Sequence, residues 1–278
     1  MGKERLDQVL VKKGLAASRE KGKALIMAGK VFVNRVRADK PGVLVSDSDE
    51  IELKGQPFPY VSRGGLKLEK ALRKFRLNME GKVVMDVGAS TGGFTHCALL
   101  NGASRVYAVD VGYGQLDWSL RQDRRVVCLE RKNARHLTGD DIGEAVDIVT
   151  IDVSFISLRK ILPAVYPFLK YGGDVVALIK PQFEAGPEKV GKKGVVRDAR
   201  VHVSVIRGIV DYCGEIGLSP LGLDFSPVAG PEGNIEFLLW LNKGREGVRT
   251  DWEQVIENVV REAREELTGL GLSKKKET

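Results

Sequence analysis

Residues 83–95 read Val-Val-Met-Asp-Val-Gly-Ala-Ser-Thr-Gly-Gly-Phe-Thr, an apolar run that passes directly into a turn of small residues. The apolar run predicts a buried strand, and the turn predicts the start of a helix. Similar runs recur at residues 105–111, 126–129, 145–152 and 174–179, separated by helical lengths. Buried strands that alternate with helices predict an α/β fold with a largely parallel sheet, whose ligands bind at the carboxyl ends of the strands.

The positive charge of the chain is concentrated at its N-terminal end. Residues 1–40 hold eleven Lys and Arg against four Asp and Glu, an excess that equals the net charge of +7 of all 278 residues. A compact basic module joined to a nearly neutral body indicates a polyanion partner, most often nucleic acid. A solvated basic face on a stable domain explains the charge equally well. The length suits one large domain, or a medium domain with a small appendage.

Composition and local pattern disfavour several classes of protein. No apolar run approaches the ~20 residues that cross a bilayer, and the charged start MGKERLDQVLVKKG does not form a signal-peptide core. We therefore expect a cytoplasmic protein without stable membrane association. The three Cys and three His residues are scattered along the chain, so no metal site is expected.

The basic segment predicts a small α+β module. Residues 5–13 and 18–29 have helical apolar spacing, with Ser18 as the N-cap of the second helix, and short strands are predicted at residues 31–33, 43–45 and 51–53. Two prolines in residues 56–60 favour a linker.

The amino-acid sequence of this segment resembles that of the S4-type RNA-binding domain. The matching phrases are Arg5-Leu6-Asp7, Ser18-Arg19 and the run at residues 26–34. The resemblance implies a module of residues 1–55 that binds structured RNA and performs no chemistry. The RNA-binding residues it implies are Arg5, Lys12, Lys13, Ser18, Arg19, Lys21, Lys23, Lys30, Arg35 and Arg37.

The glycine turn after residue 87 has the spacing Gly88-x-x-x-Gly92-Gly93, which fits the G-x-G-x-x-G rule of dinucleotide folds poorly. With Asp86 before it, the turn resembles motif I of S-adenosylmethionine-dependent methyltransferases, which implies a Rossmann-like sheet. Asp86 is expected to face the methionine end of this cofactor, Asp110 the ribose hydroxyls, a role shared with NAD enzymes, and Asn133 the adenine. The expected cofactor-binding set is Asp86, Gly88, Ala89, Ser90, Thr91, Gly92, Gly93, Phe94, Asp110, Asn133 and Asp152.

Four charged residues stand within or at the ends of predicted elements: Lys67, Asp152, Lys180 and Glu236. Charged groups at such positions cost free energy unless they are paired or solvated, so convergence in one polar site explains them together. A structural ion-pair network is the alternative for each residue taken alone.

Together these residues resemble the K-D-K-E tetrad of FtsJ-type ribose 2′-O-methyltransferases. With the S4-like module, the chain resembles the TlyA family of bacterial rRNA methyltransferases, also known by the name hemolysin A. The resemblance implies methylation of cytidine 2′-hydroxyls in 16S and/or 23S rRNA, with Lys180 at the 2′-oxygen as base or cation and Asp152 orienting it. It also implies that Lys67 and Glu236 hold the substrate and the network. The expected organisation is an RNA-binding domain at 1–55, a linker at 56–62, a catalytic domain at 63–243, and a helix with a tail at 244–278.

Rival activities lack their sequence signals. Cytosine C5 methylation uses a cysteine that usually follows proline, and none of the three cysteines does. Amino-nitrogen methylation usually carries a proline-rich clamp where this chain reads Asp152-Val153-Ser154-Phe155. A membrane-active hemolysin would need a membrane-inserting segment, whereas the amphipathic helix at residues 250–267 is expected to pack in the core, with Thr250 and Glu253 as its capping box. A non-catalytic RNA-binding scaffold would be expected to have lost tetrad residues.

Overall fold

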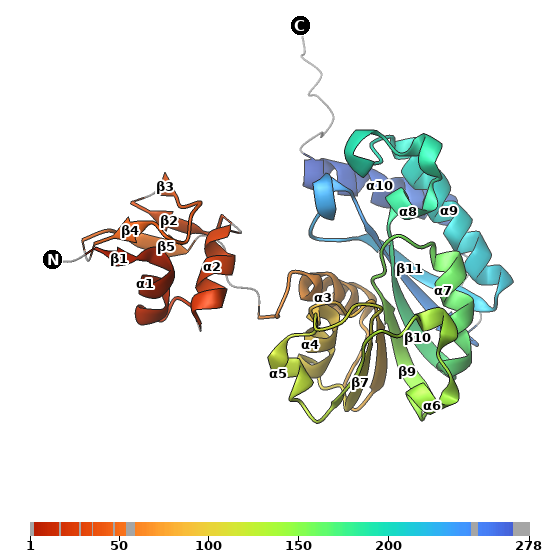
Figure 1. Ribbon diagram of the computed structural model, residues 1–278. Helices are drawn as coiled ribbons and strands as arrows, with labels where there is room; N and C mark the ends of the chain where they lie inside the picture. The colour runs from red at the N-terminus through yellow and green to blue at the C-terminus, as the bar shows by residue number, and fades with distance from the viewer. Residues whose placement is uncertain are drawn as a thin grey trace, which may run out of the picture. The chain divides into compact units, whose positions relative to one another are not determined.

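The computed structural model describes residues 3–16, 18–27, 29–34, 36–46, 48–53, 59–245 and 250–268. The chain divides into two compact units, Met1–Pro59 and Tyr60–Thr278. Each unit is described by itself (Figure 1). The predicted linker at residues 56–62 falls partly on residues 54–58, which lie outside the described residues.

The first unit packs two short helices against short antiparallel strands. Its apolar core includes Leu6, Leu10, Ile26, Val31 and Val45, all of them buried. The predicted helices and strands of this segment are confirmed, and the backbone N–H of Lys21 donates to Ser18 Oγ, the predicted N-cap. Two strands, β1 and β3, were not predicted because two-residue strands carry no readable periodicity. Its elements are β1 (Glu4–Arg5), α1 (Leu6–Lys12), α2 (Arg19–Met27), β2 (Val31–Val33), β3 (Val36–Arg37), β4 (Leu44–Val45) and β5 (Ile51–Leu53).

The second unit is built on a seven-stranded sheet of order β11-β12-β10-β9-β6-β7-β8. Only β12 runs antiparallel to its neighbours, while the pairs among β10, β9, β6, β7 and β8 are parallel. The strands are β6 (Val83–Val87), β7 (Arg105–Val109), β8 (Val126–Leu129), β9 (Val146–Ile151), β10 (Leu169–Ile179), β11 (Leu218–Phe225) and β12 (Phe237–Lys243). This sheet confirms the predicted Rossmann-like α/β fold.

Helices cover both faces of this sheet, as Figure 1 shows. Helices α3 and α4 pack on one face, and α7, α9 and α10 pack on the other. The helices of the unit are α3 (Gly64–Phe75), α4 (Gly93–Leu100), α5 (Trp118–Arg121), α6 (Gly139–Ile142), α7 (Leu158–Val165), α8 (Pro181–Glu184), α9 (Ala199–Glu215) and α10 (Trp252–Thr268). Because both faces are covered, the central parts of the strands are mostly apolar, which is why they were predictable as runs.

The apolar stripe of α10 is buried in the main core, as expected. Ile256, Val260 and Ala263 pack against the helices and strands of that core. The predicted capping box is wrong, because the backbone N–H of Gln254 donates to Asp251 Oδ1 rather than to Thr250. A carboxylate one residue later completes the same turn, and the sequence offered both acceptors side by side.

Candidate active site

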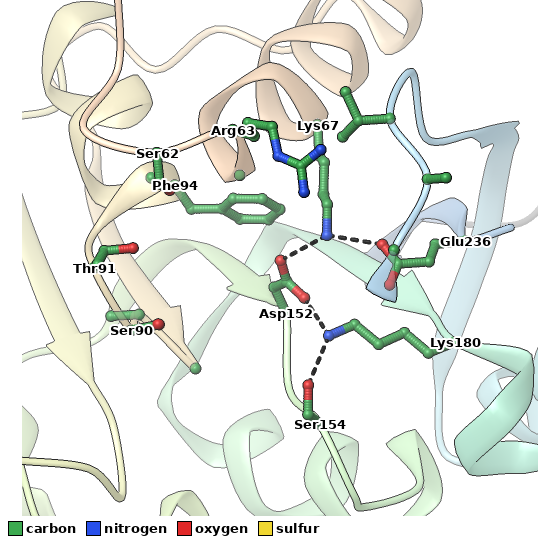
Figure 2. A pocket seen from close by; sticks show the side chains of 17 residues that line it. Ser62, Arg63, Lys67, Ser90, Thr91, Phe94, Asp152, Ser154, Lys180 and Glu236 are labelled. Atoms are coloured by element: carbon green, nitrogen blue, oxygen red, sulfur yellow. Dashed lines mark hydrogen bonds and ion pairs between the residues drawn. The ribbon is translucent and has the colours of Figure 1, made fainter. Parts of the chain in front are cut away.

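A cavity of about 330 Å³ opens where β6, β9 and β10 end and β12 begins. Parallel strands end at the same edge of a sheet, and β12 starts at that edge because it runs antiparallel to β10. Residues from α3, the glycine turn after β6 and the loop before β12 complete the wall (Figure 2). The lining residues are Ser62, Arg63, Gly64, Lys67, Gly88, Ala89, Ser90, Thr91, Gly93, Phe94, Asp152, Ser154, Lys180, Val228, Ala229, Gly230 and Glu236.

Four charged side chains in this cavity form a continuous chain of alternating sign (Figure 2). Lys67 Nζ lies 2.7 Å from Glu236 Oε2 and 3.2 Å from Asp152 Oδ2. Asp152 Oδ1 lies 2.6 Å from Lys180 Nζ, which also lies 3.0 Å from Ser154 Oγ. The four residues come from positions up to 169 residues apart, so the tertiary fold brings together all of the tetrad predicted from sequence.

These charged side chains are largely buried. The side chains of Lys67, Asp152 and Lys180 are 12%, 17% and 9% exposed, and that of Glu236 is 0% exposed. Buried charges are tolerated when they are paired, as two cations and two anions are here. The opposite charges of the four side chains neutralise one another, which explains why the fold tolerates charged residues at these buried positions.

The charged neighbours of Lys67 raise its pKa, and those of Asp152 lower its pKa. Burial lowers the pKa of Lys67, but the carboxylates of Asp152 and Glu236 outweigh burial and leave that pKa above its ordinary value. Burial raises the pKa of Asp152, yet Lys67 and Lys180 outweigh it and leave the pKa below its ordinary value. Lys67 is therefore a firmly protonated cation, and Asp152 is a firmly ionised carboxylate.

Local sequence places each of these groups. Lys67 lies on α3 and lines the cavity, and the neighbouring apolar positions Leu68, Ala71 and Leu72 of this helix are buried. Lys180 is the residue before α8, and Pro181 at the first helical position stops the strand and begins the helix there. Asp152 and Glu236 flank β9 and β12 at the same edge of the sheet, at the point where each strand ends or starts.

The glycine turn after β6 forms the floor of the cavity. Gly88 has φ of 85°, and a Cβ there would lie 2.6 Å from the backbone oxygen of Asp152. Only glycine therefore allows the turn to approach the end of β9 so closely. Of the predicted cofactor-binding residues, Gly88, Ala89, Ser90, Thr91, Gly93, Phe94 and Asp152 line the cavity.

Asp86 lies behind the cavity rather than in its wall. Its carboxylate is buried and accepts hydrogen bonds from Thr95 Oγ1 at 2.7 Å and Thr150 Oγ1 at 3.0 Å. Burial raises its pKa to about 6, against the effect of these hydroxyl donors. In the described structure Asp86 connects β6, which leads into the glycine turn, to α4 and β9 through these two hydrogen bonds. Asp86 therefore supports the wall of the cavity from behind.

Three other predicted cofactor residues also lie outside this cavity. Asp110 accepts backbone N–H groups of Ser90 and Gly112, at 2.8 and 2.6 Å. Asn133 accepts the backbone N–H of Arg135 and so caps a short 3-10 helix. Gly92 is the left-handed residue that starts α4. Their predicted cofactor contacts stay predictions.

Sequence reasoning missed several residues that line the cavity. Ser62, Arg63 and Gly64 precede the predicted tetrad residue Lys67 by three to five positions, so a signal for them existed. Residues 228–230 gave no such signal, because they lie in the long β11–β12 connection with no motif of their own. Gly230 lies against the tetrad, since a Cβ there would fall 2.3 Å from Glu236 Oε1.

The first unit holds a separate cluster of predicted RNA-binding residues. Asp7 accepts hydrogen bonds from Arg5 Nε at 3.0 Å and from Arg19 Nε at 3.0 Å. The hydrogen bonds of Arg5, the largest influence, together with those of Arg19 hold the pKa of Asp7 at about 2. Two other predicted RNA-binding residues form ion pairs within the unit: Lys12 with Glu4, and Arg37 with Asp39. Arg35 lies outside the described residues.

Metal-binding clusters and membrane-spanning helices are absent from the described part of the chain. Among those residues, no group of three His, Cys, Asp or Glu side chains is arranged to hold a metal ion. Within the same ranges, no helix is both long and apolar enough to pass through a bilayer.

Comparison with known families matches both units. An FtsJ-like methyltransferase model matches residues 60–243, and an S4 domain model matches residues 4–51. The match to the methyltransferase model covers more than half of the chain.

Two curated proteins and one solved structure are similar over most of their length. A Bacillus subtilis protein with the provisional name rRNA methyltransferase YqxC is 52% identical over 95% of each chain. The 16S/23S rRNA (cytidine-2'-O)-methyltransferase TlyA of Mycobacterium tuberculosis is 46% identical, over 85% of this chain and 89% of that protein. A structure from Streptococcus thermophilus, provisionally named a hemolysin, is 48% identical with a TM-score of 0.77 and covers 97% of this chain and 98% of that one.

Proposed function

The chain belongs to the FtsJ-like methyltransferase family and carries an S4 domain at its N-terminus, and on that premise we propose that it transfers the methyl group of S-adenosylmethionine to the ribose 2′-hydroxyl of a cytidine in ribosomal RNA. The substrate follows the relative from Mycobacterium tuberculosis, whose name specifies cytidine 2′-O-methylation of 16S and 23S rRNA. The hemolysin name belongs to the same family, so it identifies no separate activity.

The observation that carries this proposal is the buried chain Glu236, Lys67, Asp152, Lys180. A ribose hydroxyl is a weak nucleophile at neutral pH, so its proton must be accepted, or its developing negative charge stabilised, as the new bond forms. Lysines that are mostly buried and held by carboxylates suit that task, because electrostatic effects are larger for groups that have little contact with water.

The two lysines have different roles in this proposal. Lys67 lies between two carboxylates, which keep its pKa above the ordinary value, so it serves as a fixed cation that holds Asp152 and Glu236 in place. Lys180 contacts one carboxylate and the hydroxyl of Ser154. Lys180 therefore lies at the 2′-oxygen, where it accepts the proton or stabilises the alkoxide.

The residues of the cavity fit S-adenosylmethionine. The small residues Gly88, Ala89 and Gly93 line the cavity, and within the described residues Glu236 Oε1 is buried without a hydrogen-bond partner. When bound, this cofactor supplies an electrophilic methyl group on a positively charged sulfur. Asp152, ionised beside the glycine turn, is placed to stabilise that positive charge and to orient Lys180.

The first unit supplies RNA affinity without chemistry. Its guanidinium pair, Arg5 and Arg19, is exposed enough to meet phosphates while Asp7 holds both groups in position. Phosphate contacts of this kind determine where a protein sits on RNA, while the catalytic cavity determines what is modified. Loss of residues 1–55 should therefore weaken rRNA binding more than cofactor binding.

The decisive experiment transfers a labelled methyl group from S-adenosylmethionine to 16S rRNA, 23S rRNA and intact ribosomal subunits, followed by mass spectrometry of the digested nucleosides. The expected product is 2′-O-methylcytidine. A methylated base would contradict the assignment of the acceptor atom. An absence of transfer to rRNA and to subunits, with the cofactor bound, would contradict the proposed substrate.

A further inference from the structure

A second cavity on the catalytic unit shares no lining residue with the first and is lined mainly by positive side chains. It measures about 450 Å³ and is lined by Lys189, Gly191, Lys192, Lys193, Val195, Arg197 and Asp198. We call Lys189, Lys192, Lys193 and Arg197 the basic turn. All four side chains are exposed. The sequence analysis assigned these residues no role.

The backbone of the basic turn has a defined shape. Gly191 N–H donates to the carbonyl of Val195 at 3.0 Å, and Gly194 N–H donates to the carbonyl of Gly191 at 3.1 Å. Lys193 has a φ of 65°, a left-handed conformation that a lysine adopts only at a cost in free energy. Val195 is buried beneath the turn. The turn therefore presents its cations from a rigid support.

Intramolecular partners do not neutralise these cations. In the described ranges, none of the four side chains has a carboxylate within 4.0 Å. Two acids adjoin the basic turn in sequence: Asp198 caps α9 and pairs with Arg200 at 3.2 Å, and Glu188, next to Lys189, forms no ion pair with the turn in the described part of the chain. Four like charges concentrated on a small surface repel one another unless a polyanion or salt offsets them.

The basic turn is tied to the active site from two directions. Along the chain it follows Lys180 and α8. Across the fold, Asn234 Nδ2 donates to the carbonyl of Gly194 at 2.9 Å, and Asn234 Oδ1 accepts the backbone N–H of Val196 at 3.2 Å. Asn234 precedes Glu236 by two residues, so one side chain connects the turn to the loop that carries a tetrad carboxylate.

We propose that the basic turn binds the phosphate backbone of the substrate RNA on the catalytic unit, next to the nucleotide that enters the cavity. This inference rests on the proposed function, since it names a contact of the same substrate. RNA phosphates match the turn because several cations on a rigid support suit an extended series of anions. The contact adds a second anchor, independent of the S4 domain, that holds the acceptor ribose at Lys180.

The test compares two double variants that each remove two positive charges. Lys192→Gln/Lys193→Gln alters the turn, and Lys82→Gln/Arg124→Gln alters the opposite edge of the sheet, where β6 and β8 begin. Binding of 16S and 23S rRNA is measured from about 50 to 200 mM salt, with RNA KM, kcat and S-adenosylmethionine affinity measured alongside. For the turn variant we expect the slope of log K against log salt to fall by about two, with roughly tenfold weaker binding.

We also expect the turn variant to raise the RNA KM, with kcat and cofactor affinity unchanged. An RNA affinity, salt slope and KM equal to those of the control variant would overturn the proposal. A difference from wild type confined to vesicles containing phosphatidylserine would also overturn it, because a lipid surface would then be the partner. The proposed function is judged separately: wild-type protein that transfers no methyl group to rRNA contradicts that function, while the binding measurement still decides whether the turn contacts RNA.

Discussion

Asp7 in the first unit and Asp152 in the second each lie between two cations, and these two clusters differ in how far the cations reach into solvent. In the first unit Asp7 is 0% exposed, while its partners Arg5 and Arg19 are 42% and 45% exposed. In the second unit Asp152 is 17% exposed, while its partners Lys67 and Lys180 are only 12% and 9% exposed. The cations around Asp7 are exposed to solvent, whereas the cations around Asp152 are mostly buried in the wall of the cavity.

The identity of the cations matches this difference. A guanidinium has five N–H donors, so Arg5 and Arg19 can bond Asp7 on one side and a phosphate on the other. An ammonium is a compact charge that can lose its proton when its surroundings favour the neutral form. The comparison therefore teaches that the exposure and type of the cations, rather than the shared aspartate, separate a binding cluster from a reaction centre.

The largest expected effect comes from removing the inward cation at the reaction centre. Lys180→Ala should lower the rate of methyl transfer by about 10²–10⁴-fold, because the 2′-oxygen loses its base or its charge stabilisation. Binding of S-adenosylmethionine, measured by calorimetry, should change little. Lys160→Ala, on the exposed surface of α7, is the control. Near wild-type activity of Lys180→Ala would remove this residue from the mechanism.

Exchanging the two cation types between the clusters sharpens the comparison further. Lys180→Arg should lose nearly as much activity as the alanine variant, because a guanidinium does not give up its proton in proteins and is larger than the ammonium it replaces. Single-turnover rates measure this loss. Activity within about tenfold of wild type would show that Lys180 acts as a cation rather than as a base.

The reciprocal exchange in the first unit should have a smaller effect. Arg5→Lys loses a bidentate contact with Asp7, so we expect RNA affinity to fall by roughly fivefold while methyl transfer at saturating RNA is preserved. Filter binding and steady-state kinetics separate these two quantities. A fall in kcat without a fall in affinity would contradict the division between the units.

The outward cluster should also make stability depend on acid. The folded pKa of Asp7, about 2, lies below its ordinary value, so the ion pairs stabilise the first unit above about pH 4. That contribution is lost as the pH falls from about 4 to about 2. Asp7→Asn should unfold at a lower temperature than wild type at pH 7, and the difference should shrink over this interval. An equal difference at both ends would contradict the assignment.

A third buried aspartate tests whether cations set the direction of the shift. Asp86 has hydroxyl partners in place of cations, and its pKa rises to about 6. A raised carboxyl pKa means that the folded state binds the proton more tightly, so stability should decline as the pH rises from about 4 to about 6. Against Asp86→Asn, the decline in wild type should reach at most about 3 kcal/mol. Chemical denaturation at several pH values measures it, and a rise over this interval would contradict the assignment.

Much of the fold was readable because its signals are local. The runs that became β6, β8 and β9 are mostly apolar, since a parallel sheet covered on both faces buries most of its side chains. In contrast, β10 begins five residues before its predicted start at residue 174, because Lys170-Tyr171-Gly172-Gly173 carries no strand pattern. Pairing with β9 and β12, rather than local propensity, extends that strand.

The tetrad was also predictable, because charged residues at the ends of apolar strands are costly unless they converge. What could not be predicted was the pairing within it: that Lys67 lies between two carboxylates while Lys180 faces one. Those distances depend on how α3 packs on the sheet, and no local pattern in the sequence encodes that packing.

Local chemistry along the chain therefore indicated the element types, the basic first unit and the four charged residues that meet in the cavity. Only the tertiary structure decided that Asp86 lies behind the cavity and that Asn234 joins the basic turn to the loop of Glu236. The physical reason is range. Strand and helix patterns arise between near neighbours in sequence, whereas burial and the hydrogen-bond partners of a side chain depend on segments that meet only after the chain has folded.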